Sequence, residues 1–278
     1  MPSTTPDAPE PAPTPAPGAA PAEAFAPEEY PWVGPAVRSA LLLSDGVVDL
    51  DPAGGVPAPT DELSETLVDV SAIEQALAAE GVAPLAERTL VVAVGSNQTP
   101  RTIARKYRRA GGGVPVATPF VRCTVHHLAV GHVANVAAPG YVPAAPYRAE
   151  GAQMELVATW FDDAQLAVID ETEPNYARVR LSAQQHPLTL ATGAEPAHFD
   201  VYASQRGVLA DGRPIPLRHR QQELFDELVA LTGAELFIGD AAEVCARLAA
   251  RPAALAELAH EHELVAEDGL HRAREAAA

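Results

Sequence analysis

Residues 95–97, with the sequence Gly-Ser-Asn, are the first place where the chain could do chemistry. The preceding run, Thr89 to Val94, is apolar and β-branched, which predicts a buried strand. The following Thr99 is expected to cap a helix. Glycine allows a tight turn, and the next amides then point toward the helix N-terminus, where a carboxylate or phosphate binds well. A strand-to-helix turn without a ligand uses the same residues, so both interpretations stay open.

A second candidate lies between Ile169 and Tyr176, where three carboxylates end a short predicted helix just before a predicted strand. Acidic side chains near a helix C-terminus oppose the helix dipole, which disfavours a purely structural reason for them. A buried glutamate with a raised pKa suits general acid/base catalysis. The alternative is a solvated helix end.

In order and spacing, the two segments resemble the gamma-glutamylcyclotransferase family. Those proteins have a Tyr-Gly-Ser-Asn turn after the first barrel strand, then a Leu-Asp-x-x-Glu-Gly segment, then a strand that begins near a Tyr. The matching residues here are Gly95-Ser96-Asn97, Ile169-Asp170, Glu173, Tyr176 and Arg178. Shorter matches are Pro143-Ala144 through Gly151, and Val201-Tyr202. The resemblance covers about residues 89–209.

The resemblance implies a role for each matched residue. Glu173 becomes the acid/base: it takes a proton from the α-ammonium of a γ-glutamyl amine or peptide and returns one to the leaving amine, so that 5-oxoproline is released by intramolecular attack. An apolar setting around Glu173 is expected to lift its pKa toward 7. The implied substrate-binding residues are Gly95, Ser96, Asn97 and Tyr176. No cofactor and no metal is implied.

Two positions depart from the family pattern. Val94 stands where the family has Tyr, which removes a hydroxyl next to the turn. Pro174 stands where the family has Gly, which fixes that backbone angle and removes one amide donor. Two other functions therefore stay open: a non-catalytic ligand-binding or interaction protein that uses the same pocket, and an amide-processing enzyme of a specialised pathway.

Composition narrows the class of protein. The chain has 278 residues and a net charge of −18, and residues 1–87 hold 15 of its acids against one base, Arg38. Such an acidic protein repels the phosphate backbone, so nucleic acid is not expected as a partner. Lys106 is the single lysine among 19 basic residues, a bias that suggests a GC-rich coding genome, and the resemblance is to a bacterial, divergent member of the family. With no visible signal peptide and no apolar run of membrane-spanning length, we expect a cytoplasmic protein without a membrane partner.

Four segments are expected. Residues 1–34 are predicted to be a disordered Pro/Ala-rich tail, because ten prolines in residues 1–31 exclude regular structure. The alternative is a docking arm for a protein partner, which stays unknown. Residues 35–88 form an acidic extension, 89–210 the gamma-glutamylcyclotransferase-like core, and 211–278 a helical region packed on the core. The fold class is α+β: a small mixed β-barrel flanked by helices. Tyr30-Pro31-Trp32 is the expected first contact of the tail with the fold.

The expected secondary structure follows from periodicity and capping residues. Helices are predicted to begin at the caps Ser71, Thr99, Asp162 and Asp240, and further helices at residues 217–232 and from Pro252. Strands are predicted at 41–43, 46–50, 89–94, within 121–136, and at 154–161, 176–181 and 199–203. His126, His127 and His132 are predicted to be surface or core positions, His260 and His262 point to different helix faces, and Cys123 and Cys245 are predicted to be buried, inert thiols.

Overall fold

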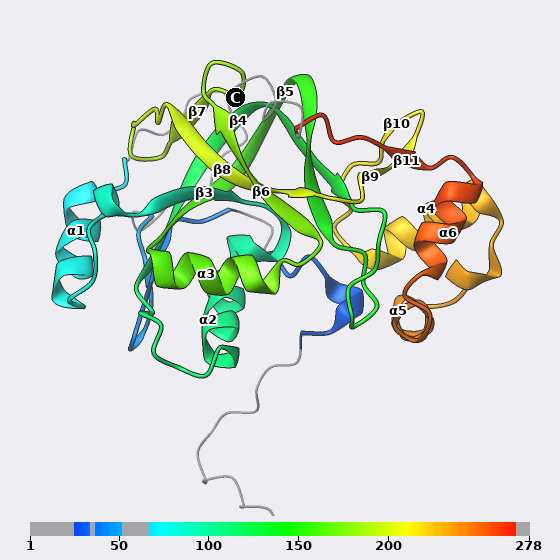
Figure 1. Cartoon of the computed structure of the whole chain (residues 1–278), viewed down its shortest axis with the longest axis horizontal. Coiled ribbons are helices and arrows are strands. Elements are labelled where there is room, and N and C mark those ends of the chain that lie inside the picture. Colours follow the sequence, from blue (N-terminus) through cyan, green and yellow to red (C-terminus); the bar gives the residue numbers. More distant parts are fainter. Residues whose placement is uncertain (1–24, 34–36, 52–66, 271–278) are drawn as a thin grey trace, which may run out of the picture.

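A curved, mixed β-sheet forms the centre of the protein (Figure 1). The structure is a computed structural model that describes residues 25–33, 37–51 and 67–270. Most of the predicted disordered tail, together with residues 271–278, lies outside these residues. No described helix is long and apolar enough to cross a membrane.

The main sheet has eight strands within the described residues, in the order β2-β1-β4-β5-β3-β8-β6, with β7 paired to β4. Their bounds are β1 Ala40–Leu43, β2 Gly46–Asp49, β3 Thr89–Ala93, β4 Thr118–His132, β5 Ala144–Phe161, β6 Tyr176–Ser182, β7 Leu188–Leu190 and β8 His198–Ser204. All pairs are antiparallel except β3 with β8, which is parallel. The pairing runs as an open path, so "barrel" describes the curvature of this sheet and not its closure.

Helices α2 (Pro100–Arg109) and α3 (Asp163–Thr172) lie along one side of the sheet (Figure 1). Thr99 caps α2 through the amide of Thr102, and Asp162 with Gln165 forms a reciprocal capping box on α3, as the sequence predicts. Their apolar faces pack on the sheet in a cluster that includes Ile103, Tyr107, Phe120, Phe161, Leu166 and Ile169. Burial of this face holds the start of α2 and the end of α3 in fixed positions.

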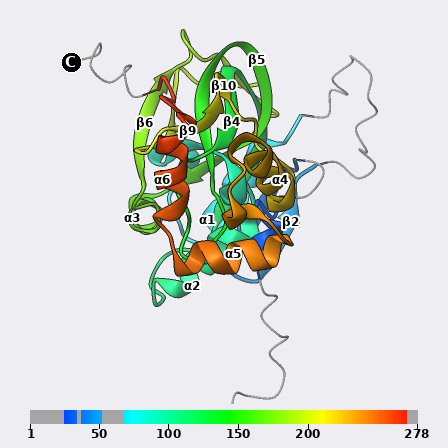
Figure 2. The ribbon, with the colours of Figure 1, turned by 90° about the vertical axis from the view of Figure 1, so that its right-hand side faces the viewer.

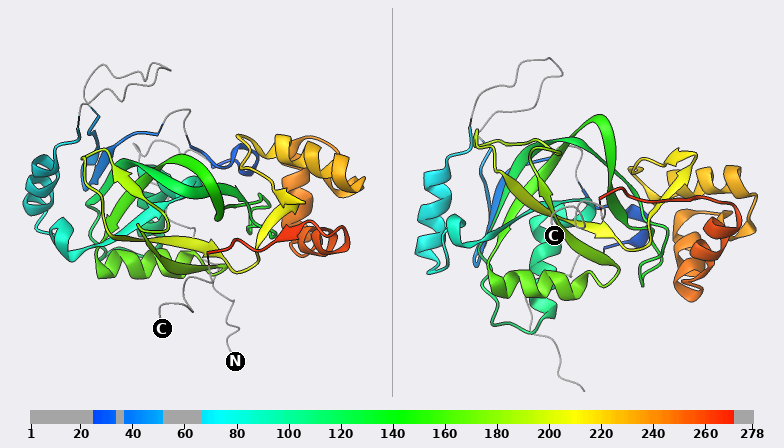
Figure 3. Two further views of the ribbon diagram at one scale, coloured as in Figure 1. Left: turned by 90° about the horizontal axis from the view of Figure 1, so that it is seen from above. Right: turned by 45° about the horizontal axis from the view of Figure 1, so that its top comes forward.

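The C-terminal part has its own apolar cluster, at the end of the molecule opposite α1 (Figures 1 and 2). Helices α4 (Gln221–Thr232), α5 (Ala241–Ala250) and α6 (Ala254–Glu261) pack beside a small sheet of β9 (Val208–Asp211), β10 (Arg213–Pro214) and β11 (Val265–Ala266). Gly233 ends α4 in the left-handed conformation and Asp240 caps α5, both as predicted. Figure 3 shows that these helices lie beside the main sheet and not across its faces.

Three elements differ from the sequence predictions. Helix α1 (Val70–Ala79) is capped by Asp69 and not by the predicted Ser71, because the Asp69 carboxylate accepts the amide of Ser71, which lies inside the first turn. Strand β4 begins at Thr118, before the predicted start, and runs as one strand with a bulge at His127, where φ is +58°. Strand β5 begins at Ala144, well before the predicted start, since its first half pairs with the end of β4 despite containing Pro146.

Residues 25–33, which we assigned to the disordered tail, pack against the fold. The short 3₁₀ turn η1 (Pro27–Glu29) lies against α4 and α5, and Tyr30 is only 3% exposed. The indole of Trp32 donates to the carbonyl of Ala26 at 2.7 Å. The expected contact at Tyr30-Pro31-Trp32 is therefore present, and it extends back to Phe25, which stacks edge-on against Trp32. Strands β1 and β2 of the acidic extension also belong to the main sheet.

Candidate functional site

The carboxylate of Glu173 meets two partners that the sequence places far from it. Its Oε1 accepts a hydrogen bond of 2.8 Å from Nδ2 of Asn97, 76 residues earlier. The same oxygen lies 2.5 Å from Nζ of Lys106. The side chains of Lys106 and Glu173 are 12% and 16% exposed, so this ion pair is largely shielded from water. Oε2 makes no hydrogen bond to the described residues, which leaves one carboxylate oxygen for a ligand.

Glu173 is held by a turn between α3 and β6. Its amide donates to the carbonyl of Asp170 at the end of the helix, and its carbonyl accepts the amide of Tyr176 at 3.0 Å. Pro174 follows it in this turn, a position at which a ring-fixed φ is favourable. The proline that departs from the family pattern therefore stiffens the backbone that carries the carboxylate.

Residues 95–98 form the 3₁₀ turn η3 (Gly95–Gln98) between β3 and α2. Gly95 has φ of +55°, which side-chain-bearing residues rarely adopt. A Cβ there would lie 2.4 Å from the Tyr30 hydroxyl oxygen and 2.9 Å from Cβ of Ala144. Both backbone conformation and space therefore require glycine. The turn directs Asn97 toward Glu173, as the bond between their side chains shows.

The Tyr30 hydroxyl lies at this turn. It accepts the amide of Ala144 at 2.8 Å, and hydrogen bonds from the backbone amides of Ala144 and Ser96 act to lower its pKa. Burial outweighs them and holds the pKa of Tyr30 well above its ordinary value. The residue that sits on the candidate anion-binding turn is thus a neutral phenol contributed by the N-terminal segment.

Two further tyrosines surround the same space. Tyr141 stacks on Tyr30 with ring centroids 4.4 Å apart, and Tyr176 donates its hydroxyl to the carbonyl of Ala144 at 2.8 Å. Burial raises the pKa of Tyr141 to about 12, and the negative charge of Glu173 adds to this rise. Burial, together with Tyr30 and Glu173, also raises the pKa of Tyr176. All three phenols therefore keep their hydrogens at neutral pH.

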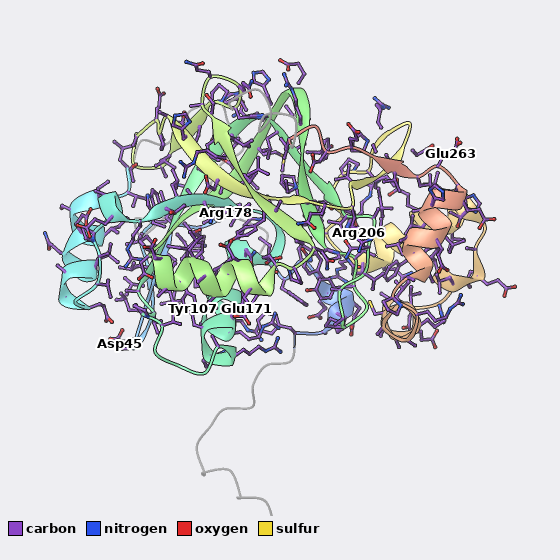
Figure 4. All side chains as sticks on the ribbon, viewed as in Figure 1. Asp45, Tyr107, Glu171, Arg178, Arg206 and Glu263 are labelled. Atoms are coloured by element: carbon purple, nitrogen blue, oxygen red, sulfur yellow. The ribbon has the colours of Figure 1, made fainter. Side chains whose placement is uncertain are left out.

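Asp170 belongs to a separate network that fixes α3 to the sheet. It accepts the Tyr202 hydroxyl at 2.7 Å and pairs with Arg178 at 3.1 Å. Arg178 in turn binds the buried Asp200 at 2.7 Å. Figure 4 labels Arg178 on β6 and Glu171, which is exposed, on α3. Of the three acids at this helix end, Glu173 alone lies at the Gly95 turn.

The structure thus brings the five predicted site residues into one region, and among them Asn97 and Glu173 are joined by a side-chain hydrogen bond. Asn97 touches Glu173, Tyr30 links Gly95 and Ser96, and Tyr176 forms part of the wall through Ala144. The expected apolar surroundings of Glu173 were wrong, because an ammonium and an amide group occupy Oε1.

Lys106 and Tyr30 were missed as site residues. Lys106 is the only lysine in a chain with 18 arginines, a signal that could have identified it, since Arg would not place a compact ammonium at this point. Tyr30 had no comparable signal, because nothing in the local pattern connects it with a turn 65 residues later.

The described residues include no cluster of three or more His, Cys, Asp or Glu side chains that could hold a metal ion. Cys123 and Cys245 are buried and free, as predicted, and burial raises the pKa of each thiol to about 12. A small cavity of about 10 Å³, on the order of one water molecule, borders Asn97, Ile169 and Tyr202. A larger open hollow of about 580 Å³, by Arg206 in Figure 4, is lined by residues 204–207 and 265–269 and holds none of the Glu173 partners.

Comparison with known proteins gives only distant similarity. No protein-family model matches the chain, and no curated protein matches it. Among solved structures, a gamma-glutamyl cyclotransferase aligns with a TM-score of 0.35 and 14% identity, covering 43% of this chain and 68% of that one. An uncharacterized protein from Homo sapiens aligns with a TM-score of 0.33 and 16% identity over the same shares. Likeness at this level is a distant resemblance of fold and carries no argument about activity.

Proposed function

We propose that the protein is an acid/base enzyme that acts on a γ-glutamyl amine or peptide and releases 5-oxoproline, with Glu173 as the group that moves the proton. The observation that carries this proposal is the contact between Glu173 and Asn97 beside the Gly95 turn. A rigid turn, a shielded carboxylate and amide donors at a helix N-terminus meet at one place. This combination suits a zwitterionic substrate whose amine must lose a proton.

The reaction needs one base and then one acid. An α-ammonium with a pKa of about 8 is mostly protonated at neutral pH, so a base must take its proton before the nitrogen can attack. The nitrogen then bonds to the γ-carbonyl carbon, closing a five-membered lactam. The bond from that carbon to the amine breaks, and the leaving nitrogen takes the proton. No water and no redox step enters the balance.

The carboxylate of Glu173 is prepared for this transfer by its partners. Asn97 and Lys106 both bind Oε1 and so fix the rotamer of the side chain. The remaining oxygen, Oε2, is the proton acceptor in this proposal. Because the rotamer is fixed, the Glu173 carboxylate needs no further reorganisation at the moment of reaction.

The Gly95 turn supplies the binding group for the carboxylate end of the substrate. It leads directly into α2, whose N-terminus carries a partial positive charge. Lys106 and the arginines of α2 add positive charge on the same element. Neither a metal nor a cofactor enters the proposed chemistry.

A second candidate is a ligand-binding protein that uses the Glu173 site without catalysis. One observation favours it: Glu173 is already ion-paired, and the Tyr30 hydroxyl already accepts from the Ser96 amide of the turn. In this case the site recognises a small molecule by the same groups but transfers no proton.

The two candidates differ in turnover. The experiment is release of 5-oxoproline from a panel of γ-glutamyl amines and γ-glutamyl peptides by the full-length protein. The enzyme proposal expects release from at least one member. Binding of a panel member without any release would contradict the enzyme proposal and support the binding protein.

A further inference from the structure

The N-terminal segment places a tyrosine hydroxyl at the Gly95 turn. Tyr30 is 3% exposed, yet it belongs to a segment that precedes every strand of the sheet. Its ring is clamped between Tyr141, stacked at 4.4 Å, and Trp32, edge-on at 5.1 Å. Its position is therefore fixed by packing on two sides.

The segment itself is anchored on α2. The guanidinium of Arg105 lies 3.7 Å from the centroid of the Phe25 ring, and that of Arg101 lies 4.3 Å from it. Cation–π contacts of this kind hold the start of the segment on α2, and the Trp32 indole bond to Ala26 closes the segment on itself. The same helix that carries Lys106 thus also carries the segment that delivers Tyr30.

The hydrogen bonds of the Tyr30 hydroxyl are incomplete. A phenol has two acceptor lone pairs and one hydrogen to donate. The amides of Ala144 and Ser96 approach as donors and use the lone pairs. No acceptor for the phenolic hydrogen is present among the described residues. A buried donor without an acceptor is costly, and such groups in native proteins call for a ligand or a functional reason.

The hydrogen remains on the oxygen at neutral pH, because burial holds the pKa of Tyr30 far above its ordinary range. Glu173 is close enough for its charge to raise that pKa further. The turn itself has no hydroxyl to offer at the preceding position, which is Val94. The Tyr30 hydroxyl therefore lies against the Gly95 turn, within electrostatic reach of Glu173.

Resting on the proposed function, we propose that Tyr30 donates its hydrogen bond to the γ-carbonyl oxygen of the substrate and stabilises the negative charge that develops there. When the α-nitrogen bonds to the γ-carbon, the π-electron pair of the carbonyl moves onto its oxygen. The Tyr30 hydroxyl donates to that oxygen without transferring its proton. The pair returns to re-form the carbonyl as the bond to the leaving amine breaks. Tyr30 is then a catalytic residue supplied from outside the segment that carries the turn and Glu173.

The test compares Tyr30→Phe with the matched control Tyr107→Phe. Both tyrosines are 3% exposed and both have a hydroxyl with a hydrogen-bond partner, but Tyr107 bonds to Thr118 in the core behind α2. Removing an oxyanion donor lowers kcat by about 100-fold to 1,000-fold. We expect this loss for Tyr30→Phe, with KM changed by less than about 3-fold, because the bond strengthens in the transition state. Tyr107→Phe should retain kcat within about 3-fold.

A second readout uses the intact protein and so does not depend on the folding of either variant. With tyrosine labelled by ¹³C at Cζ, addition of 5-oxoproline, whose lactam oxygen corresponds to the γ-carbonyl oxygen, should shift the Tyr30 signal and leave that of Tyr107 in place.

Several results would overturn the proposal. Equal kcat losses in the two variants, an unshifted Tyr30 signal, or a higher kcat in Tyr30→Phe would each do so; the last would mean that the segment blocks the site. If the wild-type protein turns over no γ-glutamyl compound, the proposed function itself fails and this role fails with it. If the wild type is active and Tyr30→Phe matches it, only the role of Tyr30 fails.

Discussion

Gly95→Ala tests whether the turn and the N-terminal segment are packed as one unit. The new Cβ meets three obstacles: a φ of +55°, the Tyr30 hydroxyl oxygen at 2.4 Å and Cβ of Ala144 at 2.9 Å. The left-handed conformation costs an alanine about 1–2 kcal/mol. The contact with the hydroxyl forces Tyr30 to move, which leaves the buried amide of Ala144 without its partner, at about 1–3 kcal/mol. We therefore expect a loss in unfolding free energy of about 2–5 kcal/mol.

The backbone part can be measured separately at Gly233. It has a similar φ of +65°, but a Cβ there meets nothing within 4 Å. Gly233→Ala should therefore cost only about 1–2 kcal/mol. The difference between the two variants is the cost of the steric contacts at Gly95, with the Tyr30 hydroxyl and with Cβ of Ala144.

A double-mutant cycle isolates the same contact. Tyr30→Phe removes the atom nearest to the new Cβ, so Gly95→Ala should cost about 1–2 kcal/mol less in that background than in the wild type. The assay is urea denaturation at equilibrium, with the free energy of unfolding taken from the linear extrapolation. Additive effects within about 0.5 kcal/mol would refute the packing of Tyr30 on the turn.

Three further changes probe the surroundings of the site. Lys106→Met removes the ammonium that binds Oε1 of Glu173, so the shielded ion pair loses one partner and turnover should fall about 10-fold or more. The control, Arg108→Met, changes an exposed residue and should have little effect on turnover. Deleting residues 1–24 should leave Tm within a few degrees. Deleting residues 1–33 also removes the buried Tyr30 and its neighbours, so the free energy of unfolding should fall by about 4 kcal/mol and Tm by about 10 °C. Burial lowers the pKa of His132 to about 3 in the folded protein, against about 6.5 in the unfolded protein. The contribution of the neutral His132 to stability is therefore complete above pH 6.5 and is lost as the pH falls toward 3, by up to about 4–5 kcal/mol. Urea denaturation at several pH values would measure this loss.

Each of these has a clear contrary result. Equal turnover in the Lys106 and Arg108 variants would remove the lysine from the site. Similar melting temperatures for the two deletions would show that residues 25–33 add nothing to the fold. For His132, whose Nε2 accepts the amide of Arg218 at 2.9 Å, the comparison is with His132→Gln. If the wild type and this variant lose stability in parallel between pH 6.5 and 4, the histidine does not carry the acid sensitivity.

The parts of the fold that the sequence predicts are those with a strong local pattern. The apolar run before Gly95 forms β3, Thr99 and Asp162 cap their helices, and Gly233 ends α4. In each case the position has a local physical reason: a capping side chain accepts a hydrogen bond from a helix amide, or a glycine adopts a positive φ. The proximity of the Gly95 turn and Glu173 required the family resemblance, because no local pattern connects them.

The remaining features depend on contacts that are distant in sequence. Tyr30 lies in a proline-rich segment of low apolar content, which predicts disorder. Its ring stacks on Tyr141 and its hydroxyl accepts the amide of Ala144, and both contacts need the folded sheet. The polar setting of Glu173 depends in the same way on the direction of α2, which brings Lys106 to the carboxylate. A prediction from neighbouring residues alone, such as Val168 and Ile169, gave an apolar setting instead.

The central claim is that Glu173 moves the proton, and Glu173→Gln tests it most directly. The amide oxygen of Gln keeps an acceptor for Asn97 and Lys106, so the fold and the shape of the site should be preserved, but it cannot accept a proton at neutral pH. Glu171→Gln, two residues away on the exposed side of α3, is the matched control. The measurement is the rate of 5-oxoproline release from the γ-glutamyl panel by the wild type and both variants. We predict a fall of roughly 100-fold or more for Glu173→Gln and a much smaller change for Glu171→Gln; equal rates for Glu173→Gln and the wild type would contradict the assignment of Glu173 as the acid/base.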